Sequence, residues 1–301
     1  MGNDLRVAVI GATGHIGRAL AVELAPQTRL TLYARRPEAA SVLAARLRPS
    51  PEVRDLSELT HHEHDALVNC IGEGDPSSVP DPAVFDSVTR LADDLTLGYL
   101  QRFRESRLIN ISSGAAYCSG FAEPVTGGEL RDECTSGDAY ARAKRLSEVR
   151  HRESDSAVID LRVFGFFSRW IDPRSTYFMA DVLRSLRSGD TLLTGTADFI
   201  RDYIAPADLA ALVLACATAG RRNTAYDVYS LAPVRKSEVL AAFVARFGLT
   251  YSSDGVTAET SGGKYAYYSL DRRAAELGYR PTRTSLEVLE EEADALLDMT
   301  G

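Results

Sequence analysis

The sequence is poor in lysine, although it is not poor in basic residues. Three of its 34 basic residues are lysines (Lys144, Lys236 and Lys264), and the remaining 31 are arginines. We interpret this bias as genomic rather than functional. It still makes each retained lysine informative, because a compact ammonium group does chemistry that a planar guanidinium cannot do.

The sequence also lacks long apolar runs and a surplus of positive charge. No apolar stretch is long enough to span a bilayer. The formal net charge of −8 and the pI of about 5.3 argue against a general nucleic-acid surface. The first residues show neither the basic nor the apolar segment of a secretory signal. We therefore expect a cytoplasmic protein that binds neither membrane nor nucleic acid.

Two groups of residues that can bind metals lack the spacing that metal sites need. The four cysteines form no C-x-x-C pair, and we expect them to be reduced and mostly packed in the interior. His61, His62 and His64 lie together, but their spacing fits no standard zinc site. We expect these histidines to lie in a solvated loop and predict no metal site.

The stretch Leu5 to Leu20 carries the strongest pattern in the chain. An apolar run, Leu5 to Ile10, predicts a buried strand, and Arg18 to Leu24 predicts a helix. Between them the glycines follow a G-x-x-G-x-x-G array. The first would allow a tight turn, the second an approach to a pyrophosphate, and the third close packing of helix on strand. The array thus predicts a dinucleotide site at the helix start. Its residues are Gly11, Thr13, Gly14, His15, Ile16 and Gly17.

Strands and helices alternate through the rest of the chain, which predicts a parallel sheet with helices on both faces. The fold class is therefore α/β, a Rossmann-type doubly wound parallel sheet with a smaller C-terminal lobe. We predict a dinucleotide-binding domain formed by residues 1–165, to which the chain returns at about residues 200–232. Residues 166–199 and 233–301 are predicted to form the substrate-binding lobe. The further predicted strands are Leu30–Ala34, Glu52–Leu56, Asp65–Ile71, Arg107–Ile111, Val158–Phe164 and Tyr226–Leu231. The further predicted helices are Glu38–Leu47, Ala83–Arg104, Asp138–Glu153, Tyr177–Arg187, Pro206–Ala217, Lys236–Phe247 and Ser285–Leu297.

The end of the second strand indicates which dinucleotide binds. Sites for NAD usually place a carboxylate there, on the ribose 2′-hydroxyl. Here the strand is followed by Arg35 and Arg36, with no carboxylate before Glu38. Two guanidinium groups suit a 2′-phosphate, so we predict NADP as the cofactor.

A tyrosine and a lysine lie one helical turn apart in the helix after the fifth strand. At this spacing, Tyr140 and Lys144 share one helix face, and the ammonium would lower the pKa of the phenol. The preceding strand ends with Ser112 and Ser113, and the residues alone do not choose between these two hydroxyls. Tyr265, Tyr267 and Tyr268 could contact a ligand, but we expect them to serve in packing.

At this point the chain resembles the extended short-chain dehydrogenase/reductases, the epimerase/dehydratase family that works on nucleotide sugars. The matching segments are GATGHIG at Gly11–Gly17, ISSGAAY at Ile111–Tyr117, YARAK at Tyr140–Lys144, RDYIAPADLA at Arg201–Ala210 and SLDRRAAELGYRP at Ser269–Pro281. The resemblance covers essentially the whole chain.

The resemblance implies a role for each site residue. It selects Ser113 as the catalytic hydroxyl, Tyr140 as the proton donor and Lys144 as the residue that holds the nicotinamide ribose. Further cofactor contacts would come from Asp55, Leu56, Cys70, Ile71, Gly72 and Phe164. Substrate contacts would come from Ser112, Gly114 and Arg201, with Arg201 aimed at the substrate's diphosphate.

The chain departs from the family pattern at two places. The fourth strand ends in Asn69-Cys70-Ile71-Gly72, where many relatives have two alanines. Gly114-Ala115 replaces the Asp-Glu pair with which the dehydratase branch eliminates water, so dehydration is not expected.

We therefore predict an NADP-dependent reductase that acts on a keto group, at C4, of a nucleotide-activated deoxysugar. The alternatives are an epimerase that retains its cofactor and a non-catalytic NADP-sensing regulator. In the family, the helices that correspond to Ala83–Arg104 and Asp138–Glu153 often pair across a two-fold axis, which predicts a homodimer.

The arginine pair generates a prediction about cofactor preference. NADPH should bind more tightly than NADH, and Arg35→Ala should narrow that difference by about tenfold or more. The reason is that a charge-assisted hydrogen bond contributes about 1.5–3 kcal/mol. Fluorescence titration with both cofactors measures the two affinities. Equal affinity of the wild type for NADPH and NADH would contradict the prediction.

Overall fold

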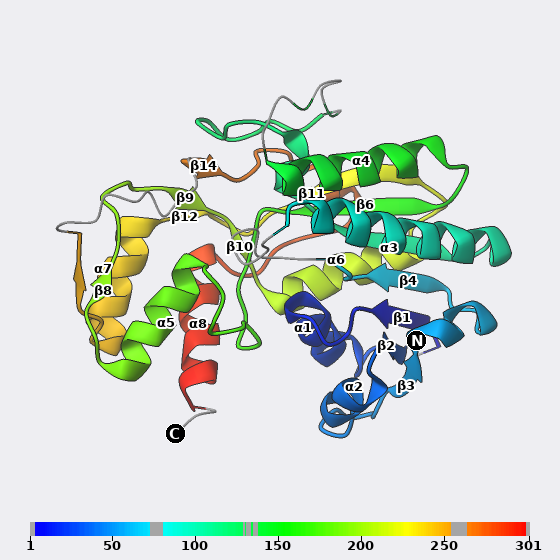
Figure 1. Ribbon diagram of the computed structural model, residues 1–301, viewed down its shortest axis with the longest axis horizontal. Coiled ribbons are helices and arrows are strands. Elements are labelled where there is room, and N and C mark those ends of the chain that lie inside the picture. Colours follow the sequence, from blue (N-terminus) through cyan, green and yellow to red (C-terminus); the bar gives the residue numbers. More distant parts are fainter. Residues whose placement is uncertain are drawn as a thin grey trace.

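The computed structural model describes residues 4–72, 81–128, 130, 134, 138–253 and 264–298. Its centre is a seven-stranded parallel sheet with the strand order β11-β6-β5-β4-β1-β2-β3 (Figure 1). This order confirms the predicted Rossmann-type α/β class. The sheet strands are β1 (Arg6–Ile10), β2 (Arg29–Ala34), β3 (Glu52–Asp55), β4 (Ala66–Asn69), β5 (Arg107–Ser113), β6 (Val158–Val163) and β11 (Asn223–Val228).

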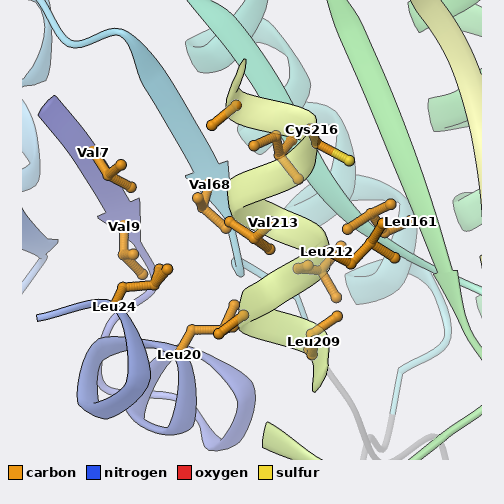
Figure 2. Close-up of a cluster of buried hydrophobic side chains, with 14 of the residues drawn as sticks. Val7, Val9, Leu20, Leu24, Val68, Leu161, Leu209, Leu212, Val213 and Cys216 are labelled. Carbon is orange, nitrogen blue, oxygen red and sulfur yellow. The ribbon is translucent and has the colours of Figure 1, made fainter. Parts of the chain in front are cut away.

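One face of the sheet is covered by helices that pack through apolar side chains. Helices α1 (His15–Leu24) and α6 (Pro206–Thr218) lie on this face, and α2 (Pro37–Ala44) packs beside β3. Figure 2 shows α6 beside α1, with Val213 next to Val68 of β4 and Leu212 next to Leu161 of β6. The strands are largely Val, Leu, Ile and Ala here, as expected where a parallel sheet is buried on both faces.

The opposite face is covered by α3 (Ala83–Arg102) and α4 (Ala139–Glu153), which pack against each other (Figure 1). Helix α4 is polar even where it is buried: Lys144, Ser147, Glu148 and His151 are all at most 8% exposed. Hydrogen bonds and ion pairs to the sheet therefore replace much of the apolar packing along this helix.

His151 is the most enclosed of these groups. Its Nδ1 lies 2.9 Å from Oδ1 of Asp160 on β6, and its Nε2 lies 3.3 Å from Oδ1 of Asp93 on α3. Asp160 also accepts a hydrogen bond from Asn110 on β5. Burial by itself lowers the pKa of His151, but the two carboxylates outweigh burial and raise this pKa to about 9. The imidazolium thus joins both helices to the sheet.

A second apolar cluster lies beside the sheet domain. It is built around α5 (Phe178–Ser188), α7 (Lys236–Phe247) and α8 (Ser285–Asp298), which occupy the left half of Figure 1. These helices come from the segments for which we predicted a C-terminal lobe. The role of that lobe in substrate binding, and its boundaries, stay predictions.

Among the described residues, short strands form three small sheets apart from the seven-stranded sheet, and most of these strands were not predicted from sequence. A strand of two residues is too short to show the alternation of apolar and polar side chains by which strands are predicted. The short strands are β7 (Gly165–Phe166), β8 (Leu192–Leu193), β9 (Ile200–Arg201), β10 (Tyr203–Ile204), β12 (Val234–Arg235), β13 (Tyr251–Ser252) and β14 (Ala266–Tyr267). Strand β14 pairs with β9 and brings residues from distant parts of the chain together.

The expectation of reduced cysteines is wrong for two of the four. Cys118 and Cys134 form a disulfide, whereas Cys70 and Cys216 are free. The pairing depends on how the chain returns from the end of β5 to the start of α4. A separation of 16 residues in the sequence does not reveal that path.

The expectation of a solvated histidine loop is wrong for His64. This residue is buried, and its Nε2 lies 3.0 Å from the hydroxyl of Tyr33 on β2. Burial lowers the pKa of His64 to about 4. No cluster of three or more His, Cys, Asp or Glu side chains suited to a metal ion occurs among the described residues. No helix in the described part of the chain is long and apolar enough to cross a membrane.

The His151 environment generates a prediction about pH and stability. Because its folded pKa lies near 9 and the free value near 6.5, the stabilisation is complete below pH 6.5 and is lost as pH rises through 9. The loss should reach about 3 kcal/mol. Urea unfolding at pH 6 and pH 10 should show this loss in the wild type and a smaller one in His151→Gln. An NMR titration that gave His151 a pKa near 6.5 would contradict the prediction.

Candidate active site

The glycine turn between β1 and α1 is sterically closed to side chains. Gly11 has a φ of +76°, and a Cβ on it would lie 2.8 Å from the backbone of Cys70. A Cβ on Gly17 would lie 2.3 Å from the carbonyl oxygen of Gly11. The tight turn and the close packing of helix on strand that we expected at Gly11 and Gly17 are therefore present. Gly14 is exposed at the start of α1, and its N–H donates to the Gly11 carbonyl at 3.0 Å.

His15 begins α1 and turns its ring towards Phe166, at 5.1 Å between centroids. Its Nε2 is shielded from solvent and has no hydrogen-bond partner in the described residues. Burial lowers the pKa of His15 to about 4, so the ring is neutral at physiological pH. Thr13 and Ile16 flank it and are each partly exposed, with Ile16 packed on the main apolar cluster.

The ends of β2 and β3 lie side by side, because Ala34 pairs with Asp55 in the sheet register. Arg35 and Arg36 follow β2 and are both exposed. The Asp55 carboxylate accepts hydrogen bonds from the backbone and hydroxyl of Ser57, which lower its pKa and cap the short helix η1 (Leu56–His61). Leu56 thus begins this helix instead of extending β3 as predicted.

The segment after β4 runs alongside the glycine turn and reaches Lys144. Cys70 donates its N–H to Ile10 at 3.0 Å, and Asn69 accepts from the Ile71 amide at 3.0 Å. A Cβ on Gly72 would lie 3.5 Å from Nζ of Lys144. Burial raises the pKa of Cys70 to about 12, so this residue is a neutral thiol. The glycine turn, Gly72 and Lys144 therefore lie next to one another in this order.

Tyr140 and Lys144 lie on one face of α4, as their spacing predicts. Asp138 starts the helix by accepting a hydrogen bond from the Ala141 amide at 3.1 Å, which places Tyr140 in the first turn. The Tyr140 ring packs edge-on against Phe85, and Nζ of Lys144 lies 5.9 Å from the centre of that ring. The Lys144 ammonium donates to the Ile111 carbonyl on β5 at 3.1 Å.

The two serines at the end of β5 have different partners. Ser112 is buried and donates to Glu148 of α4 at 2.6 Å, so its hydroxyl holds the helix, and we assign it no substrate contact. The Ser113 Oγ accepts from the Ala115 amide at 3.2 Å and lies 3.0 Å from the hydroxyl of Tyr267. The Ser112 hydroxyl is thus engaged by α4, and the catalytic role of Ser113 stays a prediction.

Tyr267 makes a contact with Ser113 that the sequence did not predict. We expected this tyrosine to serve in packing, and its ring does pack against Phe121 and Phe164. Its hydroxyl, however, reaches Ser113 across more than 150 residues of sequence. The alternating tyrosines over residues 265–268 were the available sequence signal for a short strand or a pocket wall. That pattern does not indicate which residue the Tyr267 hydroxyl contacts.

The remaining predicted contacts lie around this aromatic cluster. A Cβ on Gly114 would lie 2.4 Å from the Phe164 ring, so this glycine makes room for the ring. Phe164 itself is 5% exposed. Arg201 pairs with Tyr267 in the β9–β14 register, and its guanidinium lies 4.4 Å from the centre of the Phe199 ring. Burial lowers the pKa of Arg201.

A buried ion pair connects α4 to the sheet below the site. Arg162 of β6 pairs with Glu148 of α4 at 2.7 Å, and both side chains are at most 4% exposed. Arg162 also donates to the hydroxyl of Tyr117 at 2.7 Å, and that hydroxyl donates to Asp227 on β11. Since α4 carries Tyr140 and Lys144, this network helps to fix the position of both residues relative to the sheet.

This ion pair generates a prediction about stability. Arg162→Met leaves the Glu148 carboxylate buried without its counter-ion and should lower the free energy of unfolding by about 3–5 kcal/mol. Adding Glu148→Gln should recover part of the loss, because the amide is uncharged. Arg174→Met, which breaks an exposed pair with Asp172, is the control and should leave the unfolding midpoint unchanged. Equal urea midpoints for Arg162→Met and the wild type would contradict the prediction.

Solved structures of several nucleotide-sugar enzymes share this fold. The UDP-N-acetylglucosamine 4-epimerase of Methanobrevibacter ruminantium has a TM-score of 0.80 at 16% identity, over 99% of each chain. The UDP-glucose 4-epimerase of Thermotoga maritima has a TM-score of 0.80 at 16% identity, over 98% of this chain and 99% of its own. The dTDP-glucose 4,6-dehydratase of Bacillus anthracis, solved with NAD, has a TM-score of 0.76 at 15% identity, over 98% and 97%.

No curated protein sequence matches the chain. Residues 7–232 match the model of the NAD dependent epimerase/dehydratase family. This match spans the glycine turn, the two serines, and the tyrosine and lysine of α4. The chain therefore belongs to the NAD dependent epimerase/dehydratase family.

Proposed function

We propose that the protein reduces a keto group, at C4, of a nucleotide-activated deoxysugar with NADPH. The observation that carries the proposal is the placement of Ser113 at the end of β5 and of Tyr140 and Lys144 on one face of α4, where Lys144 is bonded to Ile111 of β5 and lies next to Gly72. In open parallel sheets this edge is where ligands bind.

The residues of the turn fit a dinucleotide. Gly11 and Gly17 allow the tight turn and the close packing of α1 on β1, and the start of α1 offers backbone amides to a phosphate. We assign the pyrophosphate to residues 11–17 and the adenine to Asp55 and Leu56. The exposed Arg35 and Arg36 follow β2, beside Asp55, where a ribose 2′-phosphate would lie.

When bound, the nicotinamide supplies the hydride. Ser113 donates a hydrogen bond to the substrate oxygen, and Tyr140 gives its phenolic proton to that oxygen as negative charge develops. Lys144 is fixed by the Ile111 carbonyl and serves the cofactor ribose and the Tyr140 phenol. Arg201, partly buried on an aromatic ring, is assigned to the substrate's diphosphate.

An epimerase with a retained cofactor is the second candidate, because several structures with this fold are epimerases. The two activities differ in stoichiometry: a reductase consumes one NADPH per product, and an epimerase consumes none. A dehydratase is not proposed, since Phe164 leaves no room for an acidic side chain at residue 114. The test is NADPH consumption, followed at 340 nm, with keto-sugar nucleotides and with the corresponding alcohols.

We also propose that the protein is a homodimer formed through α3 and α4. Three large apolar side chains are exposed on these helices: Leu91 at 70%, Leu146 at 48% and Val149 at 36%. Helices α3 and α4 pack against each other, so a two-fold axis would complete a four-helix bundle.

The catalytic assignment predicts distinct effects for Tyr140 and Lys144. Tyr140→Phe removes one oxygen and should lower kcat by about 10²–10⁴-fold, with little change in NADPH affinity. Lys144→Ala should weaken NADPH binding as well as turnover. Lys144→Arg should not restore either property, because a planar guanidinium does not fit a point-charge site. Wild-type turnover by Tyr140→Phe would show that another group is the acid.

The dimer proposal predicts that charge on the α3–α4 face separates the subunits. Leu91→Asp combined with Leu146→Asp should convert a dimer to a monomer, as measured by light scattering at micromolar concentration, because burying two carboxylates per subunit is costly. Leu193→Asp is the control, since Leu193 is 65% exposed on β8. A monomeric wild type would contradict the proposal.

A further inference from the structure

We propose that Tyr267 is a positioning residue that fixes the Ser113 hydroxyl as a hydrogen-bond donor to the reacting oxygen of the substrate. This inference rests on the proposed function and assigns the C-terminal segment a part in it. Tyr267 lies on β14, far from the serine and from α4 in the sequence.

A serine hydroxyl has a limited hydrogen-bonding capacity. Such a group has one hydrogen to donate and two lone pairs that accept. The Ala115 amide donates to Ser113 Oγ at 3.2 Å, and the Tyr267 hydroxyl lies 3.0 Å away. If Tyr267 donates, both lone pairs are filled, and the hydrogen of Ser113 is left for the substrate.

The surroundings of Tyr267 favour this direction. The phenol is 9% exposed, and a buried hydroxyl that donates to nothing is costly. Within the described residues, Ser113 is the acceptor that the structure provides for this hydroxyl.

Burial raises the pKa of Tyr267 well above its ordinary range, and the neighbouring Tyr140 acts in the same direction. Tyr267 therefore keeps its proton at neutral pH. The two tyrosines of the site thus have different tasks: Tyr140 gives up a proton, and Tyr267 holds one in place.

The ring of Tyr267 is held from several sides. Phe121 lies 4.6 Å and Phe164 5.3 Å from it, measured between centroids. The Lys264 ammonium lies 5.2 Å and the Arg201 guanidinium 5.7 Å from its centre. Pairing of β14 with β9 fixes the backbone. A phenol restrained in this way can hold the serine in one orientation.

The experiment compares Tyr267→Phe, Ser113→Ala and the double variant with the wild type, using dTDP- and UDP-4-keto-6-deoxyglucose as probes and NADPH as reductant. Tyr267→Phe keeps the ring and removes the hydroxyl. This substitution should lower kcat about three- to tenfold, which is the effect expected from the loss of one neutral hydrogen bond. The KM and the NADPH affinity should be nearly unchanged. In the Ser113→Ala background the same substitution should have no further effect on kcat.

Tyr265→Phe is the matched control, because Tyr265 lies two positions before Tyr267 and is 43% exposed. This variant should behave as the wild type.

Thermal unfolding of the same four proteins without ligands gives a second measurement. The two substitutions should be non-additive in unfolding midpoint, because they break the same hydrogen bond. Coupling in stability without coupling in kcat would overturn the inference, since the bond would then only support the fold. A rise in kcat for Tyr267→Phe would also overturn it and show that the phenol blocks the site.

Failure of the proposed function gives a different result. If the wild type reduces neither probe, or if Ser113→Ala turns over at the wild-type rate, the reductase proposal falls and the role of Tyr267 falls with it. If Ser113→Ala is impaired and Tyr267→Phe is not, the reductase proposal stands and only the inference about Tyr267 is overturned.

Discussion

The buried ion pair between Glu148 and Arg162 is the constraint on which the candidate site depends. Helix α4 has little apolar surface towards the sheet, so hydrophobic packing alone does not fix its rotation. Glu148 and His151 instead lock the helix to β6 through charges that have no access to water. Because Tyr140 and Lys144 continue the same helical face towards the amino end, the anchor and the proposed chemistry share one element. A rotation of α4 would break the ion pair and misplace both residues.

The same polar network extends across the sheet. Arg162 on β6 reaches Tyr117 after β5, and Tyr117 reaches Asp227 on β11, which also accepts from Ser269. Strands that are far apart in the sequence are thus linked by direction-dependent bonds, whereas the α1–α6 face is held by non-directional apolar contacts. One face of the sheet therefore contributes most of the apolar burial, and the other fixes the positions of side chains. The proposed catalytic groups lie on the face that has directional bonds.

Much of this could be predicted from the sequence, for identifiable reasons. The parallel sheet could be predicted from the apolar runs and from the alternation of strands and helices. The roles of Gly11 and Gly17 could be predicted from the tight turn between strand and helix. The shared face of Tyr140 and Lys144 followed from helical spacing. The rest depends on contacts between distant segments. The sequence does not show that Tyr267 meets Ser113, that Ser112 is committed to Glu148, that Cys118 meets Cys134, or that His64 is buried under Tyr33. Each is set by tertiary geometry that local periodicity does not encode.

The Cys118–Cys134 disulfide has a consequence for the integrity of the chain. It joins the segment just after β5 to the segment just before α4, so a covalent link runs between the elements that carry Ser113 and Tyr140. A single cut by an endoprotease between these two cysteines would leave the amino- and carboxyl-terminal fragments bonded to each other. Nicked protein would migrate as one band on a denaturing gel without reductant and as two bands with it. The strands β1 to β5 and the strands β6 and β11 would part only after both backbone and disulfide were broken.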